Sequence, residues 1–338
     1  MIPSDLSDIF DLFIVDFIQP GSRFYIPALL LACFLTFWAY RGQELQKTLN
    51  ELFNRDIWWS KSVRLDYKLF FTLSILLGIW PLVVGAIQIP IVHTIRDTLL
   101  QQSGYFNADS WPSWTIMALY TFILFIVADF TQFIVHVAFH KIPFLWEFHK
   151  LHHTATTLNP FTVYRFHPVE IFTGKFCVLV SISTVTGVFV HLFGGRISIF
   201  LVMGAPIINF CLDSFGGVLR HTIVPFRYPE LIEKIIISPR QHQLHHSRVH
   251  KHFDKNFGNG LAVWDLIFGS LIHSPKTNDP LNYGVIEDGK LIEDHGFISN
   301  LFINPFRVLF TKAIGRLKSL LIKALNKLKS FNILKSTH

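Results

Sequence analysis

Residues Asp129 to His153 read D-F-T-Q-F-I-V-H-V-A-F-H-K-I-P-F-L-W-E-F-H-K-L-H-H and follow a long apolar run. This stretch holds five of the 17 histidines in the chain, namely His136, His140, His149, His152 and His153. His136 and His140 are spaced i, i+4, so both rings project from one face if the apolar helix continues through them. This is a spacing at which two helical histidines can bind one metal ion.

The H-x-x-H-H pattern of this stretch returns later in the chain. The segment S-P-R-Q-H-Q-L-H-H-S supplies His242, His245 and His246. Neutral imidazole is a ligand for Fe, Cu, Zn and Ni. The eight histidines in these boxes exceed the roughly four ligands that one zinc ion takes, so we expect two metal ions. The chain has neither the Glu-x-x-His pairs of soluble di-iron bundles nor the H-E-x-x-H of zinc proteases.

Composition points to a membrane protein. Of the 338 residues, 51% are hydrophobic and only 16% are charged, whereas soluble domains usually carry about 25% charged residues. The net charge of +7 comes from residues 306–338, which hold eight Lys or Arg and no Asp or Glu. The remainder is close to neutral, so nothing indicates a nucleic-acid partner. The three cysteines lie in apolar stretches without C-x-x-C, which argues against disulfides and thiolate metal sites.

Five apolar segments approach the roughly 20 residues that a bilayer core requires. They are residues 25–40, 69–92, 115–135, 172–193 and 197–212, of which the last two could form a hairpin. The loop 41–68 has six Lys or Arg, whereas the loop 93–114 has only Arg96. By the positive-inside rule, the first loop is cytoplasmic and the second is outside. We therefore predict a multi-pass integral membrane protein with its histidine boxes on the cytoplasmic face.

The last segment shows a helical stripe of apolar residues with Lys and Arg on the other faces. The stripe consists of Phe310, Ile314, Leu317, Leu321, Ala324, Leu328 and Phe331. This pattern favours an amphipathic helix on an anionic membrane surface. The alternative is a helix packed against the rest of the protein.

Seven motifs occur in a characteristic order. They are H-V-A-F-H (136–140), W-E-F-H-K-L-H-H (146–153), R-F-H-P-V-E (165–170), H-T (221–222), S-P-R-Q-H-Q-L-H-H-S (238–247), D-K-N-F-G (254–258) and W-D-L-I-F-G-S (264–270). Together they resemble the integral-membrane fatty acid hydroxylase and sterol desaturase superfamily, over about residues 115–270. The resemblance implies an all-α membrane helical bundle with a membrane-face domain that holds a histidine-rich dinuclear metal site. We expect N-terminal transmembrane helices in residues 1–114, a catalytic domain in 115–275 and a tail in 276–338.

The resemblance also implies two iron ions, with O2 as co-substrate. The implied iron ligands are His136, His140, His149, His152, His153, His221, His242, His245 and His246. His167 is a candidate tenth ligand. The chain departs from the fatty acid hydroxylase branch in having Gly217 where a histidine is expected four residues before His221.

Residues beyond the ligand set are also candidates. Asp129 lies seven residues before His136 at the end of an apolar span, where an ionisable group is costly, so it is a candidate catalytic residue. His167, in R-F-H-P, is the second candidate catalytic residue. We expect Asp129 to accept a hydrogen bond from a ligand histidine, and the alternative is exposure to lipid headgroups. Arg165, Asn256 and Asp265 could orient ligands or only brace the structure, and His250 and His252 are weaker ligand candidates.

The expected reaction is the hydroxylation or desaturation of an unactivated C–H position of a lipid. Sterols, fatty acyl chains, alkylglycerol ethers and amino-acid lipids all fit the family. The chain contains no haem-binding cytochrome b5-like segment, no G-x-G-x-x-G and no ferredoxin cysteine pattern, so the electrons must come from a separate cytochrome b5-like protein, ferredoxin or reductase. The alternatives are a zinc-dependent membrane enzyme, a histidine-cluster metal transporter and a purely structural membrane protein.

Overall fold

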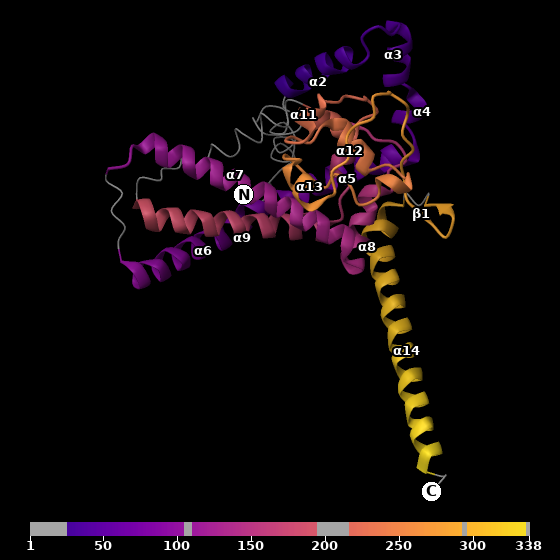
Figure 1. Cartoon of the computed structure of the whole chain (residues 1–338). Helices are drawn as coiled ribbons and strands as arrows, with labels where there is room; N and C mark the ends of the chain where they lie inside the picture. The colour runs from indigo at the N-terminus through magenta and orange to yellow at the C-terminus, as the bar shows by residue number, and fades with distance from the viewer. Residues whose placement is uncertain (1–25, 105–109, 195–215, 293–295, 336–338) are drawn as a thin grey trace.

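The computed structural model describes residues 26–104, 110–194, 216–292 and 296–335, which are mostly helical (Figure 1). The α-helices are α2 (Ile26–Ala39), α3 (Leu45–Leu52), α4 (Arg55–Trp58), α5 (Lys61–Leu77), α6 (Trp80–Ser103), α7 (Ser113–Lys141), α8 (Pro143–His153), α9 (Pro168–Phe193), α11 (Glu230–Glu233), α12 (Pro239–His245), α13 (Val263–Phe268) and α14 (Asn304–Lys335). The shorter elements are the 3-10 turns η1 (Pro160–Tyr164), η4 (Gly217–His221) and η5 (His250–His252), the π-helical turn η6 (Ser299–Ile303), and the paired strands β1 (Ile286–Glu287) and β2 (Lys290–Leu291). The expected all-α fold is confirmed.

In the described part of the chain, three helices are long and apolar enough to cross a bilayer, namely α6, α7 and α9. They form an elongated bundle in which α9 packs along both α6 and α7 (Figure 1). The core between α7 and α9 consists of Ile116, Tyr120, Leu124, Phe189 and Phe193. Gly187 lets α6 approach α9 closely, because a Cβ at this position would lie 2.7 Å from Cβ of Ile95.

The predicted spans therefore need correction. The prediction of a span over 69–92 is wrong, because the helix is broken at residues 78–79, between α5 and α6, and Leu69 and Leu73 are fully buried. Pro81 lies in the first turn of α6, where proline starts a helix rather than breaking it. The first predicted span corresponds to α2, whose 14 residues are shorter than the three spanning candidates. The predicted span 197–212 lies outside the described residues.

The two ends of the bundle differ. At one end, the Oγ of Ser103 in α6 lies 3.2 Å from Nε2 of His191 in α9, and the rings of Trp111 and Phe193 are 5.8 Å apart. At the other end, α7 finishes at Lys141 and leads through a sharp turn into α8. The last turns of α7 carry His136 and His140, so the histidines are at the end of the bundle opposite to the α6–α7 connection.

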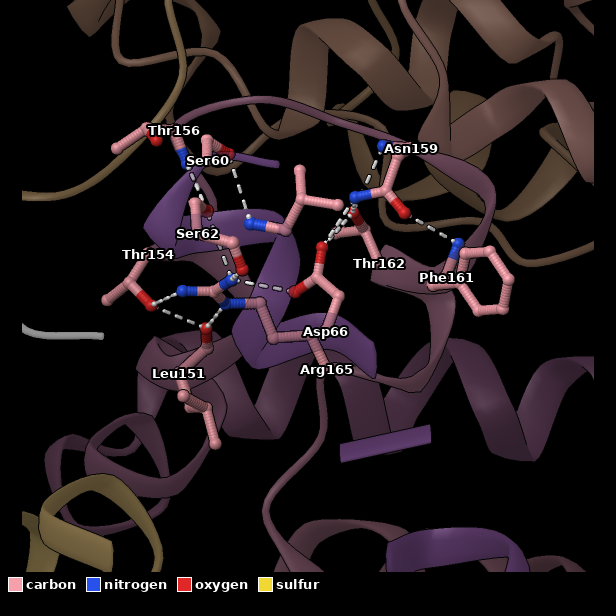
Figure 2. A network of polar contacts seen from close by, with 11 residues as sticks. Ser60, Ser62, Asp66, Leu151, Thr154, Thr156, Asn159, Phe161, Thr162 and Arg165 are labelled. Carbon is pink, nitrogen blue, oxygen red and sulfur yellow. Dashed lines mark hydrogen bonds and ion pairs between the residues drawn. The ribbon is translucent and has the colours of Figure 1, made fainter. Parts of the chain in front are cut away.

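A buried ion pair joins α5 to the chain that follows α8 (Figure 2). Arg165 and Asp66 are both fully buried, and Nη1 of Arg165 lies 2.7 Å from Oδ1 of Asp66. Arg165 also donates to the carbonyl of Leu151 and to Oγ1 of Thr154, at the C-terminal end of α8. The other oxygen of Asp66 accepts from Asn159 and Thr162. This network fixes the end of α8, where two histidines follow Leu151.

Helix α14 contacts the rest of the protein through its first turns. The ring of Phe306 packs 5.7 Å from that of Phe148 in α8, and Lys312 forms an ion pair with Glu147 of the same helix. From residue 310 to 323 every residue is exposed. The remainder of α14 extends away from the body, crosswise to the bundle of α6, α7 and α9 (Figure 1).

The Arg165–Asp66 pair gives a prediction for stability. Arg165→Met should destabilise the folded protein by about 3–5 kcal/mol, because it leaves the Asp66 carboxylate buried without its cation. Thermal unfolding of the detergent-solubilised protein measures the loss. Arg64→Met on the exposed face of α5 is the control, and it should change stability by less than about 0.5 kcal/mol. Equal melting temperatures for the two variants would contradict the structural role of the pair.

The arrangement of the bundle gives a second prediction. Accessibility tags inserted after Asn54 and after Lys329 should be reached from the same side of the membrane as the histidines, which the basic loop 41–68 predicts to be the cytoplasm. A tag near Gln102 should be reached from the opposite side. Labelling of intact cells with a membrane-impermeant reagent distinguishes the two sides. A cytoplasmic tag at residue 102 would refute the proposed arrangement of spans.

Candidate metal centre

Nine histidines converge in two adjoining groups at the end of the bundle. The first group is His136, His140, His149, His153 and His245, and the second is His152, His221, His242 and His246. Within each group, one ring nitrogen from every member lies within 4.8 Å of the others. These are the nine histidines that the family resemblance implies as ligands. The structure thus brings all of them together.

The H-x-x-H-H boxes divide their histidines between the two groups. In α8, His149 and His153 are one helical turn apart and face the first group, whereas His152 points to the second. At the end of α12 the division is reversed, with His245 in the first group and His246, the residue after the helix, in the second. Neighbouring residues on a helix project about 100° apart, so two adjacent histidines can serve two different centres. The repeated box therefore builds a paired site.

The nitrogen separations fit metal coordination. In the first group, Nε2 of His149 lies 3.0 Å from Nε2 of His140 and 3.1 Å from Nε2 of His153. In the second, Nε2 of His221 lies 3.2 Å from that of His152 and 3.0 Å from that of His242. Two imidazole nitrogens bound at about 2.1 Å and at right angles to one ion lie about 3.0 Å apart.

Hydrogen bonds fix the tautomers of three rings in the first group. The Nδ1 of His149 donates to Oε1 of Glu170 at 2.5 Å. The Nδ1 atoms of His136 and His245 donate to the carbonyl oxygens of Phe257 and Lys255, each at 2.8 Å. A backbone carbonyl, like an ionised carboxylate, can only accept, so Nδ1 carries the proton and Nε2 presents a lone pair. Three lone pairs directed at one buried point need a cation between them, so this donor set fits a metal ion.

Burial keeps the imidazoles neutral. Burial, followed by the neighbouring histidines, lowers the pKa well below its ordinary value for His149, His152, His153, His242, His245 and His246. Neutral rings are the form that binds metal, and protonation would have to displace the ion. The second group differs in one respect, because the Nδ1 atoms of His152, His242 and His246 are buried and have no hydrogen-bond partner among the described residues.

The loop 254–265 supplies two of the orienting carbonyls, and buried polar side chains hold it in place. Asp265 accepts from the backbone N–H groups of Phe257 and Gly258. Asn256 donates to the carbonyl of Gln241 in α12 and accepts from the N–H of Ile272. Asn256 has φ of 56°, and a Cβ on Gly258 would lie 2.4 Å from the Leu261 carbonyl. The D-K-N-F-G motif therefore has a structural basis.

Two sequence-based assignments differ from the structure. The carboxylate of Asp129 does not contact a histidine but accepts from the N–H groups of Gly260 and Leu261 and from Nε1 of Trp264. It lies on the predicted face of α7, two turns before His136, and a loop far along the chain meets its need for donors. Asp129 thus braces the loop whose Phe257 carbonyl orients His136.

His167 lies outside both groups. Its Nδ1 accepts from the N–H of Val169 at the start of α9, and its Nε2 bonds to the carbonyl of Leu301 at 2.8 Å. Both ring nitrogens are therefore engaged in hydrogen bonds, so His167 does not join either group as a tenth ligand. The second group contains four histidines although position 217 is a glycine rather than a histidine. His250 is exposed, and Nδ1 of His252 contacts Oγ of Ser247, so neither belongs to the groups.

Glu170 is the residue that sequence reasoning missed. It lies in the R-F-H-P-V-E motif at the start of α9, and its side chain is buried against His149. A glutamate two residues after a proline in the first turn of a helix is ordinary on dipole grounds alone, so its partner could not be read from the sequence. The signal that could have found it is its place at the membrane face, where a buried carboxylate needs a donor.

Comparison with known proteins agrees with the geometry. Residues 121–270 match the fatty acid hydroxylase family. The chain is 29% identical over 215 residues to the ornithine lipid hydroxylase OlsE of Rhizobium tropici and 26% identical over 220 residues to the fatty acid hydroxylase vlmA of Lecanicillium sp, in each case covering 64% of this chain and 57% of the relative. It is 24% identical over 161 residues to the human alkylglycerol monooxygenase, covering 48% of this chain and 32% of that protein.

The chain thus spans little more than half the length of the first two relatives. No solved structure shows a significant match to it. The region matched by the family, residues 121–270, contains all nine histidines of the two groups. Residues 121–270 of this chain are thus similar to the fatty acid hydroxylase family.

Proposed function

We propose that this chain is an O2-dependent di-iron hydroxylase that acts on an unactivated C–H position of a membrane lipid. The observation that carries the proposal is the convergence of nine imidazoles, seven of them from buried residues, into two adjoining groups. In the balanced reaction, the C–H bond becomes C–OH and the second oxygen atom leaves as water. Two electrons and two protons from outside the substrate complete the balance.

The nine histidines would be the iron ligands. The first group would hold one ion through five imidazoles and the second would hold another through four. Bound iron supplies the activation of O2 and the oxidation of the C–H bond. The protein holds the imidazoles neutral and in place, because burial disfavours their protonation and the acceptors Glu170, Phe257 and Lys255 set their orientation.

The position of the histidines supports a lipid substrate. His136 and His140 lie in the last turns of the spanning candidate α7, so the site is at the end of the bundle where an acyl chain or headgroup could reach it. Three relatives are named for their lipid substrates: an ornithine lipid hydroxylase, a fatty acid hydroxylase and an alkylglycerol monooxygenase. Their names favour hydroxylation over desaturation.

The electrons would come from a separate protein on the cytoplasmic side. The basic loop 41–68 precedes α6, and α6 begins at the histidine end of the bundle, so the positive-inside rule favours a cytoplasmic location for that end. A cytochrome b5-like protein, a ferredoxin or a reductase would dock on this face. The donor would have to approach the nine-histidine site closely, since the chain has no motif for a second redox group.

A zinc enzyme is the competing hypothesis, because four imidazoles also suit a tetrahedral zinc ion. The five imidazoles of the first group exceed that number. A metal transporter needs ligands along a path within the spans, whereas these rings gather at one end of α7 and in α8, η4 and α12. Metal analysis of protein purified without chelators separates iron from zinc.

Removal of one ligand from each group tests the site. His245→Ala and His246→Ala should each lower the bound iron and reduce lipid hydroxylation by more than about 100-fold, because even the loss of an outer partner of a metal ligand costs 10–100-fold. Iron per chain and product formation in membranes are the measurements, together with expression level. His250→Ala, on an exposed neighbouring histidine, is the control and should retain both. Full activity in either ligand variant would refute the assignment.

Substitution of Glu170 tests the orientation of His149. Glu170→Gln keeps the shape but loses the carboxylate that accepts from Nδ1 of His149, so iron affinity or turnover should fall by about 10–100-fold. The matched control is Glu147→Gln, because Glu147 is also buried but bonds to Lys150 and Lys312. The iron content after dialysis against a graded chelator series reads out the affinity. An unchanged release curve for Glu170→Gln would show that the carboxylate has no part in holding the ligand.

A further inference from the structure

Helix α14 has an exposed amphipathic surface that the metal site does not use. Each residue from 310 to 323 is exposed, including large apolar side chains. Phe310 is 69% exposed, Leu317 59% and Leu321 54%, and they share one face of the helix because they are spaced by seven and four residues. An exposed apolar face of this length would promote aggregation in water, so we expect a partner or a membrane to cover it.

The charges on α14 identify what covers this face. Residues 306–338 contain eight Lys or Arg and no Asp or Glu. At 100° per residue, Arg307 and Lys318 flank the apolar stripe on one side, and Arg316 and Lys323 flank it on the other. Basic side chains on both edges of an apolar face match the boundary of an anionic bilayer, where the stems cover acyl chains and the charges reach phosphates. A second copy of the same helix would bring like charges together instead.

The geometry agrees with this surface. α14 begins against α8 at the histidine end of the bundle and extends crosswise to α6, α7 and α9 (Figure 1). A helix that crosses the direction of the spans runs along a membrane surface rather than through it. The contacts of Phe306 with Phe148 and of Lys312 with Glu147 hold its first turns to α8 and leave the apolar stripe unused.

We propose that residues 310–335 of α14 lie in the interface of an anionic leaflet, with the face of Leu317 and Leu321 among the acyl chains. The helix thereby fixes the histidine end of the protein relative to the lipid surface through its attachment to α8. This proposal concerns the membrane surface and does not depend on iron or on turnover.

Depth measurements on the full chain test the proposal. Single cysteines replace Leu317 and Ser319 in a chain whose Cys33, Cys177 and Cys211 are changed to serine, and each is labelled with a nitroxide. The protein is reconstituted in vesicles of phosphatidylcholine with or without phosphatidylglycerol. In anionic vesicles, the ratio of collisions with oxygen to collisions with a water-soluble nickel chelate should be at least about fivefold higher at 317 than at 319, because only one face enters the interface.

The anionic requirement is tested separately. Arg316→Glu together with Lys318→Glu, or high salt, should reduce the difference between positions 317 and 319, since exposed charge attraction is screened and reversed. Lys312 is left unchanged because it holds α14 to α8. Equal exposure of both labels to the nickel chelate in anionic vesicles would overturn the proposal. Protection at 317 accompanied by spin–spin broadening that vanishes on dilution with unlabelled protein would also overturn it, in favour of contact between two chains.

Discussion

The gathering of nine imidazoles, seven of them from buried residues, around two points is the constraint on which the rest of the structure depends. A buried nitrogen lone pair without a partner costs about 1–3 kcal/mol, and here several converge within 4.8 Å of one another. A shared cation would remove this cost for all rings in a group at once. Metal binding and folding would therefore be coupled, because a cation between the rings offsets the cost of burying them together.

The surrounding polar network follows from that constraint. Glu170 and the carbonyls of Lys255 and Phe257 take the Nδ1 protons, which leaves Nε2 for the centre. Asp129 and Asp265 in turn hold the loop that carries those carbonyls. Each of these three carboxylates is buried and accepts hydrogen bonds from backbone or ring N–H groups. A substitution at any of them would therefore act through the histidines rather than on the substrate.

The sequence predicted the site better than it predicted the spans. The histidine spacings pointed to eight of the nine histidines that converge, because helical periodicity is a local property. The resemblance to the family added His221. The division of His152 from His153, and of His245 from His246, depends on how α8 and α12 face each other and could not be read locally. The misassignment of Asp129 has the same origin, since its donors lie 131 residues or more along the chain.

Hydropathy alone does not show whether an apolar residue is surrounded by lipid or by protein. By hydropathy, Leu69 and Leu73 belong to a span. Leu69 nevertheless packs with Leu65, Leu151 and Leu301 in a buried cluster that includes the C-terminal part of α8. That cluster and the Asp66–Arg165 pair tie the segment before the first spanning candidate to α8. The division at residue 114 stays a prediction, and these contacts argue that α5 folds with the histidine region. A cut at that boundary would remove Asp66 from Arg165, and the end of α8 that carries His152 and His153 would then lose the support for its last carbonyls.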